Sequence, residues 1–267
     1  MPSILDRIVE RKREEISRLP QTPITSDSLA KAMSARKDRR DFLAAVRRPR
    51  SGSVGLIAEV KKASPSACLI CANFDPVRIA REYEAAGADC LSVLTDEHFF
   101  QGSLDYLKQI RAAVKLPLLR KDFIIDARQL LEAVEFGADA VLLIVAILDD
   151  RQLAELHRLA SGAGLAVLVE VHDEIELNRA LAIGATLLGI NNRNLKDFVV
   201  SLETTERLAQ RLAVSKSAGS VTVVAESGIH SRADVERVAR AGSHSILVGE
   251  SLMRSGNIGE KVRELLS

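Results

Sequence analysis

Charged side chains that could exchange protons stand at the ends of several apolar segments of this chain. Glu59 and Lys61 close the first segment, Lys121 follows the third, and Glu170 lies near the end of the fifth. A charged lysine donates a proton and a carboxylate accepts one, and ionisable groups crowded into one pocket shift each other's pKa values. One charged residue at such a place usually marks only where the chain meets water. Their repetition at six segment ends predicts an acid–base catalytic site.

The last two segments predict a site for an anion. Ser227 and Gly228 lead into a helix near Ser231, and Gly249 and Glu250 open a short turn. In eight-fold βα barrels, glycine-containing loops after strands seven and eight present free backbone N–H groups to a phosphate. We therefore predict a phosphorylated substrate. The alternative interpretation is that these glycines only allow tight turns.

Eight short apolar segments, separated by stretches of helical periodicity, must position these groups. The predicted strands are 54–60, 90–94, 116–120, 140–145, 166–171, 187–190, 221–225 and 245–248. Helices fit between them, for example at 77–86, 104–114, 128–136, 149–161 and 232–241. This alternation predicts a parallel sheet covered on both faces. Side-chain alternation puts Glu59 and Lys61 on one face, where Glu170 could partner them.

A repeated junction favours closure of the sheet into a barrel. Helical stretches end in a glycine, suited to a left-handed cap, and a strand begins at once, at junctions starting at residues 86, 136, 183 and 241. The spacing is about two βα units, as expected for a (βα)8 TIM barrel. An open doubly wound sheet, with fewer strands and a reversal in their order, is the alternative. We predict that residues 54–267 form the barrel.

Residues 1–53 precede the repeat and predict an extra N-terminal helical segment. Ile4, Ile8 and Ile16 have helical spacing with the charged run 11–15 on the polar side, and a basic stretch follows at 39–50. The simpler interpretation is a solvated helix face and a linker. The functional alternative is a helix over the barrel mouth that lends positive charge to an anionic substrate. We expect the extension to pack on the barrel within one structural domain.

Composition excludes several classes of protein. The chain has the length of one barrel, at 267 residues, and its net charge of +1 creates no field for nucleic acid or a membrane surface. Its apolar runs are too short to span a bilayer, no signal-peptide core opens it, and three cysteines make no disulfide framework. We expect a cytoplasmic, monomeric enzyme without nucleic-acid or membrane partners.

Six motifs, taken in order along the chain, resemble those of the indole-3-glycerol-phosphate synthase family. They are residues 57–66, 119–124, 168–171, 189–193, 225–229 and 248–250, and residues 4–15 resemble the family's opening helix. The resemblance implies a carboxy-lyase of tryptophan biosynthesis. Such an enzyme converts 1-(2-carboxyphenylamino)-1-deoxyribulose 5-phosphate to indole-3-glycerol phosphate with loss of carbon dioxide and water. It implies no metal, flavin or nicotinamide.

The resemblance also implies roles for individual residues. Lys121 would be the general acid that protonates the ribulose carbonyl, and Glu170 the base whose proton abstraction restores the aromatic ring. Lys61 would hold the substrate carboxylate and donate a proton in the dehydration, with Glu59 and Asn191 positioning these groups. The phosphate cradle would be formed by Ser227, Gly228, Gly249 and Glu250, of which Ser227 is also counted as catalytic. The other substrate-binding residues of the polar rim would be Ser64, Arg193 and Glu226. Those around the anthranilate ring would be Phe100, Phe123, Leu142, Leu195 and Leu247.

The loop after Lys61 departs from the family's pattern. After Ser66 the family continues with a basic residue and a glycine, whereas this chain has Ala67 and Cys68. We expect a loop with less charge and less mobility, which would bear on turnover. Cys68 and Cys71 form a Cys-x-x-Cys, but zinc would need a second pair and a redox role a thioredoxin-like unit, so unpaired thiols are expected.

Two other phosphate-binding barrels and one non-enzymatic barrel are the alternatives to this function. Phosphoribosylanthranilate isomerase would use a cysteine–aspartate pair, and the tryptophan synthase α subunit two carboxylates without a lysine pair. A catalytically dead barrel that senses a phosphorylated metabolite is the non-enzymatic alternative, supported only by the altered loop. His172, two residues after Glu170, is expected at the surface, with contact to the rim of the site as the alternative.

Overall fold

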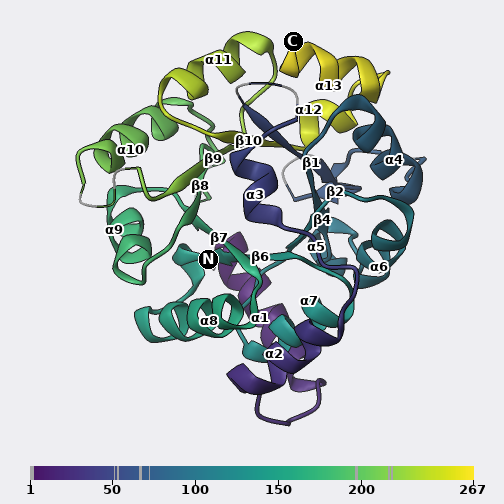
Figure 1. Ribbon diagram of the computed structural model, residues 1–267, viewed down its shortest axis with the longest axis vertical. Helices are drawn as coiled ribbons and strands as arrows, with labels where there is room; N and C mark the ends of the chain where they lie inside the picture. Colours follow the sequence, from purple (N-terminus) through teal and green to yellow (C-terminus); the bar gives the residue numbers. More distant parts are fainter. Residues whose placement is uncertain are drawn as a thin grey trace.

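Eight parallel strands close into a barrel in the computed structural model (Figure 1). The structure describes residues 3–50, 52, 54–65, 68–71, 73–195, 198–215, 217 and 219–267. Neighbouring strands follow the order β1-β10-β9-β8-β7-β6-β5-β4, which returns to β1. Their bounds are β1 Gly55–Val60, β4 Cys90–Leu94, β5 Leu118–Lys121, β6 Ala140–Ile144, β7 Ala166–Val171, β8 Leu187–Asn191, β9 Thr222–Glu226 and β10 Ser245–Val248. The prediction of a TIM barrel is confirmed, and the open doubly wound sheet is excluded.

Helices between the strands form an outer ring around the sheet (Figure 1). They are α4 Pro76–Ala86, α6 Leu104–Ala113, α7 Ala127–Glu135, α8 Asp150–Ala163, α9 Glu174–Ala182, α10 Glu203–Ala213, α11 Arg232–Arg240 and α13 Ile258–Leu266. Short elements stand in the loops: the strand pair β2 Ala63–Ser64 and β3 Cys68–Leu69, α5 Glu97–Phe100, the 3-10 turn η1 Val145–Ile147 and α12 Glu250–Met253. The glycines of the repeated junctions adopt positive φ, from 76° at Gly184 to 108° at Gly242, as the pattern predicted.

Apolar side chains fill both sides of the sheet. Every residue of β1 is buried, which explains why this strand is apolar without alternation. Ile57, Leu119, Leu168 and Val224 belong to a cluster inside the barrel, and a larger cluster joins the outer face to the helices. The barrel is thus a packed core, and a ligand has room only at its ends.

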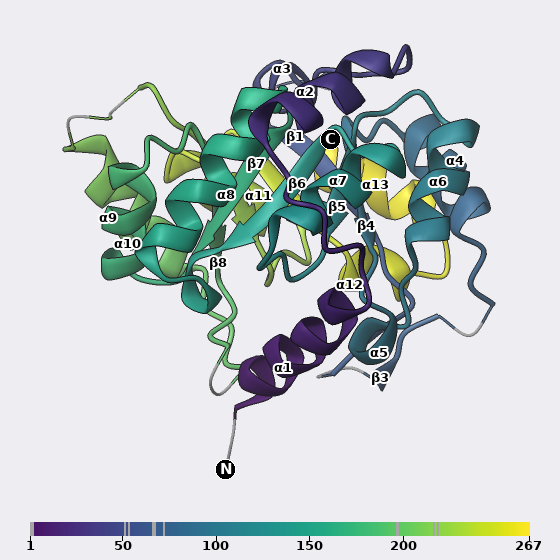
Figure 2. The same ribbon diagram turned by 90° about the horizontal axis from the view of Figure 1, so that it is seen from below.

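The N-terminal segment covers both ends of the barrel. Helix α1 (Ile4–Ser17) lies across the end where α5 and α12 stand, whereas α2 (Ser26–Ala35) and α3 (Phe42–Arg47) lie at the opposite end (Figure 2). Phe42, 1% exposed, packs into the inner cluster and plugs that end. Helix α1 has the solvated polar face of the simpler interpretation, with Arg13 and Glu14 exposed, and it also packs on the barrel, since Ile8 and Ile16 are buried.

The basic stretch before β1 binds the closed end of the barrel. Arg40 donates from Nη1 to the Leu116 carbonyl at 2.6 Å, and Arg47 donates from Nε to Thr222 Oγ1 at 2.7 Å. These guanidinium groups bind polar groups at the end of the barrel opposite α1, so they lie far from any ligand at the mouth.

Among the helices described, none is long and apolar enough to cross a membrane.

Candidate active site

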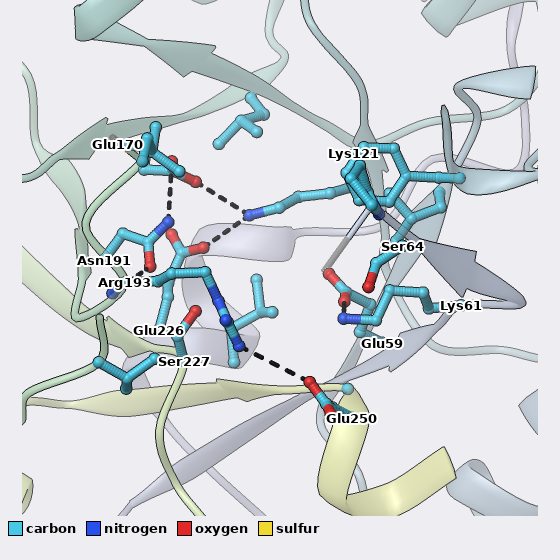
Figure 3. Close-up of a pocket in the computed structure, with 18 of the residues that line it drawn as sticks. Glu59, Lys61, Ser64, Lys121, Glu170, Asn191, Arg193, Glu226, Ser227 and Glu250 are labelled. Atoms are coloured by element: carbon cyan, nitrogen blue, oxygen red, sulfur yellow. Dashed lines mark hydrogen bonds and ion pairs between the residues drawn. The ribbon is translucent and has the colours of Figure 1, made fainter. Parts of the chain in front are cut away.

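A pocket opens at the carboxyl ends of the strands, under helix α1, and holds about 1240 Å³ of empty space including its mouth (Figure 3). Every residue that the sequence analysis placed in a site lines it: Glu59, Lys61, Ser64, Phe100, Lys121, Phe123, Leu142, Glu170, Asn191, Arg193, Leu195, Glu226, Ser227, Gly228, Leu247, Gly249 and Glu250. Parallel strands of a closed barrel deliver their last residues to one rim, which explains this convergence.

Lys121 lies at the centre of the charged groups. Its Nζ is 3.0 Å from Glu170 Oε2 and 2.6 Å from Glu226 Oε2, and the three side chains come from β5, β7 and β9. Burial alone would lower the pKa of Lys121, but the carboxylates of Glu226, Glu170 and Glu59 outweigh burial and raise that pKa. Lys121 is therefore a charged ammonium at neutral pH.

Glu170 is held from three sides. Burial would raise its pKa, but the Lys121 ammonium and His172 keep the pKa well below its usual range. Asn191 donates from Nδ2 to Glu170 Oε1 at 3.1 Å and so fixes the orientation of the carboxylate. Glu170 is thus an ionised carboxylate with one oxygen on the amide and the other on the ammonium.

His172 is not the surface residue that the sequence analysis expected. Its side chain is only 12% exposed and bridges two carboxylates, with Nε2 3.3 Å from Glu170 Oε1 and Nδ1 2.9 Å from Glu176 Oε2. Burial would lower the pKa of His172, but these two carboxylates raise it to about 10. The expectation failed because α9, which carries Glu176, folds back against the end of β7.

Glu226 differs from Glu170 although both contact Lys121. Burial, together with the nearby charge of Glu170, raises the pKa of Glu226 to about 7 against the opposing effect of Lys121. Its Oε1 is buried without a hydrogen-bond partner in the described part of the chain, and a Cβ on Gly189 would lie 2.0 Å from that oxygen. Gly189 is therefore required for the carboxylate to fit against β8.

Glu59 and Lys61 form a second ion pair across the pocket, with Lys61 Nζ 2.8 Å from Glu59 Oε1. The positions of these residues in the sequence suggested Glu170 as a partner of both. In the structure Lys61 pairs with Glu59, and Glu170 pairs with Lys121. Burial would raise the pKa of Glu59, but Lys61 and Lys121 lower it. A Cβ on Gly249 would come within 2.5 Å of Glu59 Oε1, so this glycine makes room for the pair.

Of the predicted anion-binding residues, Ser227 lies across the pocket from Lys61, whereas Gly249 lies against Glu59, the partner of Lys61 (Figure 3). Ser227 and Gly228 both have positive φ, of 65° and 76°, and Asn192 holds this turn by donating to the Ser227 carbonyl at 3.1 Å. Arg193 Nη2 lies 3.6 Å from Glu250 Oε2 (Figure 3). The tight turn that was the alternative interpretation is therefore present, and the same turn borders the pocket.

Apolar side chains form a slot beside the charged groups. The rings of Phe100 and Phe123 lie 5.9 Å apart at an interplanar angle of 37°. Sequence reasoning missed several apolar lining residues, because they come from α1 and from the long loop after β8: Ile4, Leu5, Ile8, Phe198 and Val200. For α1, the helical spacing of its apolar residues was the available signal.

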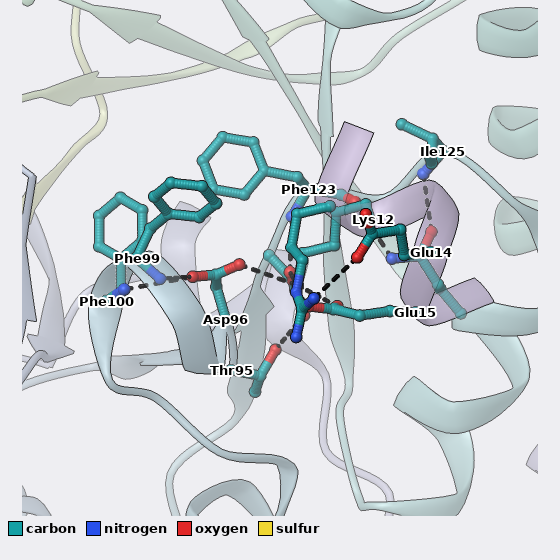
Figure 4. A network of polar contacts seen from close by, with 12 residues as sticks. Lys12, Glu14, Glu15, Thr95, Asp96, Phe99, Phe100, Phe123 and Ile125 are labelled. Atoms are coloured by element: carbon teal, nitrogen blue, oxygen red, sulfur yellow. Dashed lines mark hydrogen bonds and ion pairs between the residues drawn. The ribbon is translucent and has the colours of Figure 1, made fainter. Parts of the chain in front are cut away.

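Lys12 lies inside the protein, not on the polar face of α1 to which the charged run 11–15 was assigned. Its side chain is 3% exposed and contacts Asp96, Asp122 and Glu15 (Figure 4). The functional alternative for α1 is thus correct about its place over the mouth. The charge of Lys12 itself is paired with Asp96 and Asp122, and a contribution of this segment to the charge felt by an anionic substrate stays a prediction.

The cysteines of the altered loop are free thiols, with Cys68 exposed and Cys71 partly buried. Cys68 has positive φ in the short β2–β3 hairpin. The expected effects of Ser66 and Ala67 fall on positions outside the described residues. No group of three His, Cys, Asp or Glu side chains suited to a metal ion occurs in the part of the chain that the structure describes.

A closed parallel barrel with lysine–carboxylate pairs at its carboxyl-terminal mouth defines a TIM-barrel protein with an acid–base site. Solved structures support the fold alone. 3-hexulose-6-phosphate synthase from Salmonella typhimurium matches with a TM-score of 0.60 at 17% identity, covering 80% of this chain and 97% of that one. Thiamine phosphate pyrophosphorylase from Pyrococcus furiosus matches with a TM-score of 0.58 at 18% identity, covering 80% and 94%.

Sequence comparison identifies the family. The family model for indole-3-glycerol phosphate synthase matches residues 5–265. The chain is 49% identical over 268 residues to the indole-3-glycerol phosphate synthase of Desulfotalea psychrophila, covering 99% of each. It is 48% identical over 272 residues to that of Albidiferax ferrireducens, covering 100% of this chain and 99% of the relative. The chain belongs to the indole-3-glycerol phosphate synthase family, as its motifs predicted.

Proposed function

We propose that this pocket closes the indole ring of indole-3-glycerol phosphate, with Lys121 as the general acid and Glu170 as the general base. The activity is that of the family, a carboxy-lyase of tryptophan biosynthesis. The supporting observation is one buried ammonium held between an ionised carboxylate and a carboxyl that titrates near neutral pH.

The reaction requires a proton for the ribulose carbonyl of the substrate. Lys121 supplies it as the aryl carbon that bears the carboxylate attacks the carbonyl carbon, so that the carbonyl oxygen becomes a hydroxyl. Loss of carbon dioxide leaves its bonding electrons in the ring. The hydroxyl then departs as water with a proton from Lys61, and Glu170 takes the proton whose loss restores aromaticity. Each acid or base of this kind contributes about 10²–10⁴-fold in rate.

Binding orients the substrate across the pocket. The phosphate meets the turns of Ser227, Gly228 and Gly249, and the aryl ring enters the slot of Phe100 and Phe123. Separating the two ends in this way holds the ribulose carbon chain between Lys61 and Lys121. No metal or organic cofactor takes part in this scheme, because protonation and proton removal account for every step.

The setting of the enzyme completes the proposal. The extension 1–53 and the barrel form one domain, since Phe42 enters the inner cluster and Ile8 borders the pocket. Free thiols fit a reducing cytoplasm, and a net charge of +1 favours a small anionic substrate over nucleic acid. We expect one chain to be sufficient for activity.

Adding 1-(2-carboxyphenylamino)-1-deoxyribulose 5-phosphate tests the proposal through the fluorescence of the indole product. The chain contains no tryptophan, so indole emission rises from a low background. We expect catalytic turnover without added metal or cofactor. Absence of product from protein that is folded by circular dichroism would refute the proposal and favour the barrel that only senses a phosphorylated metabolite.

A further inference from the structure

A buried ammonium joins the N-terminal helix to two active-site loops. Lys12 Nζ on α1 lies 2.9 Å from Asp96 Oδ2 and 2.9 Å from Asp122 Oδ1, and 2.8 Å from Glu15 Oε2 (Figure 4). The side chains of Asp96 and Asp122 are 0% and 2% exposed. Burying charged groups costs several kcal/mol each unless they are paired, so this contact is not an incidental surface ion pair.

Each aspartate also holds one aromatic wall of the slot. Asp96 begins helix α5, and its Oδ1 accepts hydrogen bonds from the backbone N–H of Phe99 at 2.7 Å and of Phe100 at 3.2 Å. Asp122 follows Lys121 directly, and its Oδ1 accepts from the backbone N–H of Phe123 at 2.8 Å. A shift of either carboxylate therefore moves the ring of Phe100 or Phe123.

The roof of the slot depends on the same contact. Ile8 lies one helical turn before Lys12 on the same face of α1, and Ile4, Leu5 and Ile8 all line the pocket. Lys12 thus fixes the apolar roof and both aromatic walls relative to one another.

The two aspartates depend on Lys12 to different extents. Asp122 has other donors, because Arg120 Nη2 lies 3.0 Å from its Oδ2 and Thr95 Oγ1 donates to the same oxygen at 2.6 Å. Among the described residues, Lys12 is the one cation within 4.0 Å of Asp96. Loss of Lys12 therefore leaves the charge of Asp96 without a cation and also removes the link between α1 and the loop that carries Phe100. Only the missing charge compensation can be restored by neutralising Asp96, because the link to α1 needs the ammonium of Lys12.

We propose that Lys12 is a positioning residue that sets the affinity of the active site for the aryl half of its substrate. Through Asp96 and Asp122 it holds the packed rings of Phe100 and Phe123 in place beside the apolar residues of α1, while the phosphate half binds independently at the turns after β9 and β10. The inference deepens the proposed function and rests on it for the identity of the aromatic group.

The test compares two ligands that share a phosphate but differ in the aryl group. Indole-3-glycerol phosphate and glycerol 3-phosphate are titrated into the wild-type chain, Lys12→Met and the matched control Arg13→Met, which removes an exposed charge from the same helix. We expect Lys12→Met to weaken the binding of indole-3-glycerol phosphate by about tenfold or more, which is about 1.4 kcal/mol. In turnover, the same variant should raise KM more than it lowers kcat. Glycerol 3-phosphate should bind within about twofold of wild type.

A second variant separates positioning from stability. Lys12→Met combined with Asp96→Asn leaves no uncompensated charge and keeps the side-chain oxygen that begins α5. We expect this double variant to regain most of the lost unfolding free energy without regaining aryl affinity. Equal weakening of both ligands, or recovery of aryl affinity in the double variant, would overturn the inference. Failure of the proposed function itself is distinguishable, because wild type would then form no product and show no preference for the indole ligand.

Discussion

Replacing Lys121 by alanine removes the cation between two buried carboxylates, and the structure predicts the size of the effect. Glu170 and Glu226 are 4% and 2% exposed and lie within 3.0 Å of the ammonium. Leaving both carboxylates ionised without it would cost about 3–5 kcal/mol of unfolding free energy. The cost depends on pH, because Glu226 already has a pKa of about 7 beside Lys121 and takes up a proton first.

The sign follows from proton linkage. A carboxyl whose pKa is raised by folding stabilises the protein below its ordinary pKa, and this contribution is lost as pH rises through the raised value. Without Lys121 the pKa of Glu226 rises further, so the unfolding free energy of Lys121→Ala should fall more steeply than that of wild type between pH 5 and pH 8, values chosen to bracket about 7. Turnover should fall by about 10²–10⁴-fold because the general acid is gone.

Three measurements check this prediction. Indole fluorescence gives turnover, urea unfolding at pH 5 and pH 8 gives stability on both sides of about 7, and titration with glycerol 3-phosphate gives phosphate affinity, which should be retained. Lys108→Ala, an exposed lysine on α6, is the control and should leave all three unchanged. Turnover within about tenfold of wild type would remove Lys121 from the acid role. Equal losses of stability at both pH values would show that Glu226 does not take up the proton.

Three further predictions concern other parts of the molecule. Gly189→Ala places a Cβ 2.0 Å from Glu226 Oε1, so we expect a loss of about 1–3 kcal/mol in urea unfolding and slower turnover; unchanged values would show that Glu226 has another place to lie. His172 has a pKa of about 10 against an ordinary 6.5, so the unfolding free energy of wild type should fall as pH rises between these values. His172→Gln should lack that fall. Parallel pH profiles of unfolding for the two proteins would contradict the bridge to Glu170 and Glu176. Phe42→Ala should destabilise the barrel by about 3–5 kcal/mol with KM unchanged, since Phe42 plugs the opposite end, and a raised KM would show coupling between the ends.

Much of the fold follows from local pattern. Each strand of the barrel lies within two residues of its predicted bounds, because a strand buried on both faces must be an apolar run and a glycine cap must end the preceding helix. The convergence of Lys121, Glu170 and Glu226 on one rim also follows from chain order, once the strands are parallel and the sheet is closed. That Lys121 acts as the acid, Glu170 as the base and Glu226 as a rim residue stays a prediction.

The partner of each charged residue did not follow from pattern. Lys61 binds Glu59 and not Glu170, because strand register and tilt decide which side chains meet inside a barrel. Lys12 and His172 were each assigned to solvent from their neighbours in sequence. Lys12 is buried because the distant loops after β4 and β5 pack over it, whereas His172 is buried by the adjacent helix α9, which turns back against the end of β7.

By itself, then, the sequence determined the barrel, the strand that delivers each charged residue, and the end at which those residues gather. These depend on hydrophobic period and chain order, which are local properties. Only the tertiary structure decided which carboxylate each lysine contacts, and that a lysine of the N-terminal helix holds the aromatic slot. Those contacts depend on ångström distances between segments far apart in the chain, and at such distances burial and Coulomb energy change steeply.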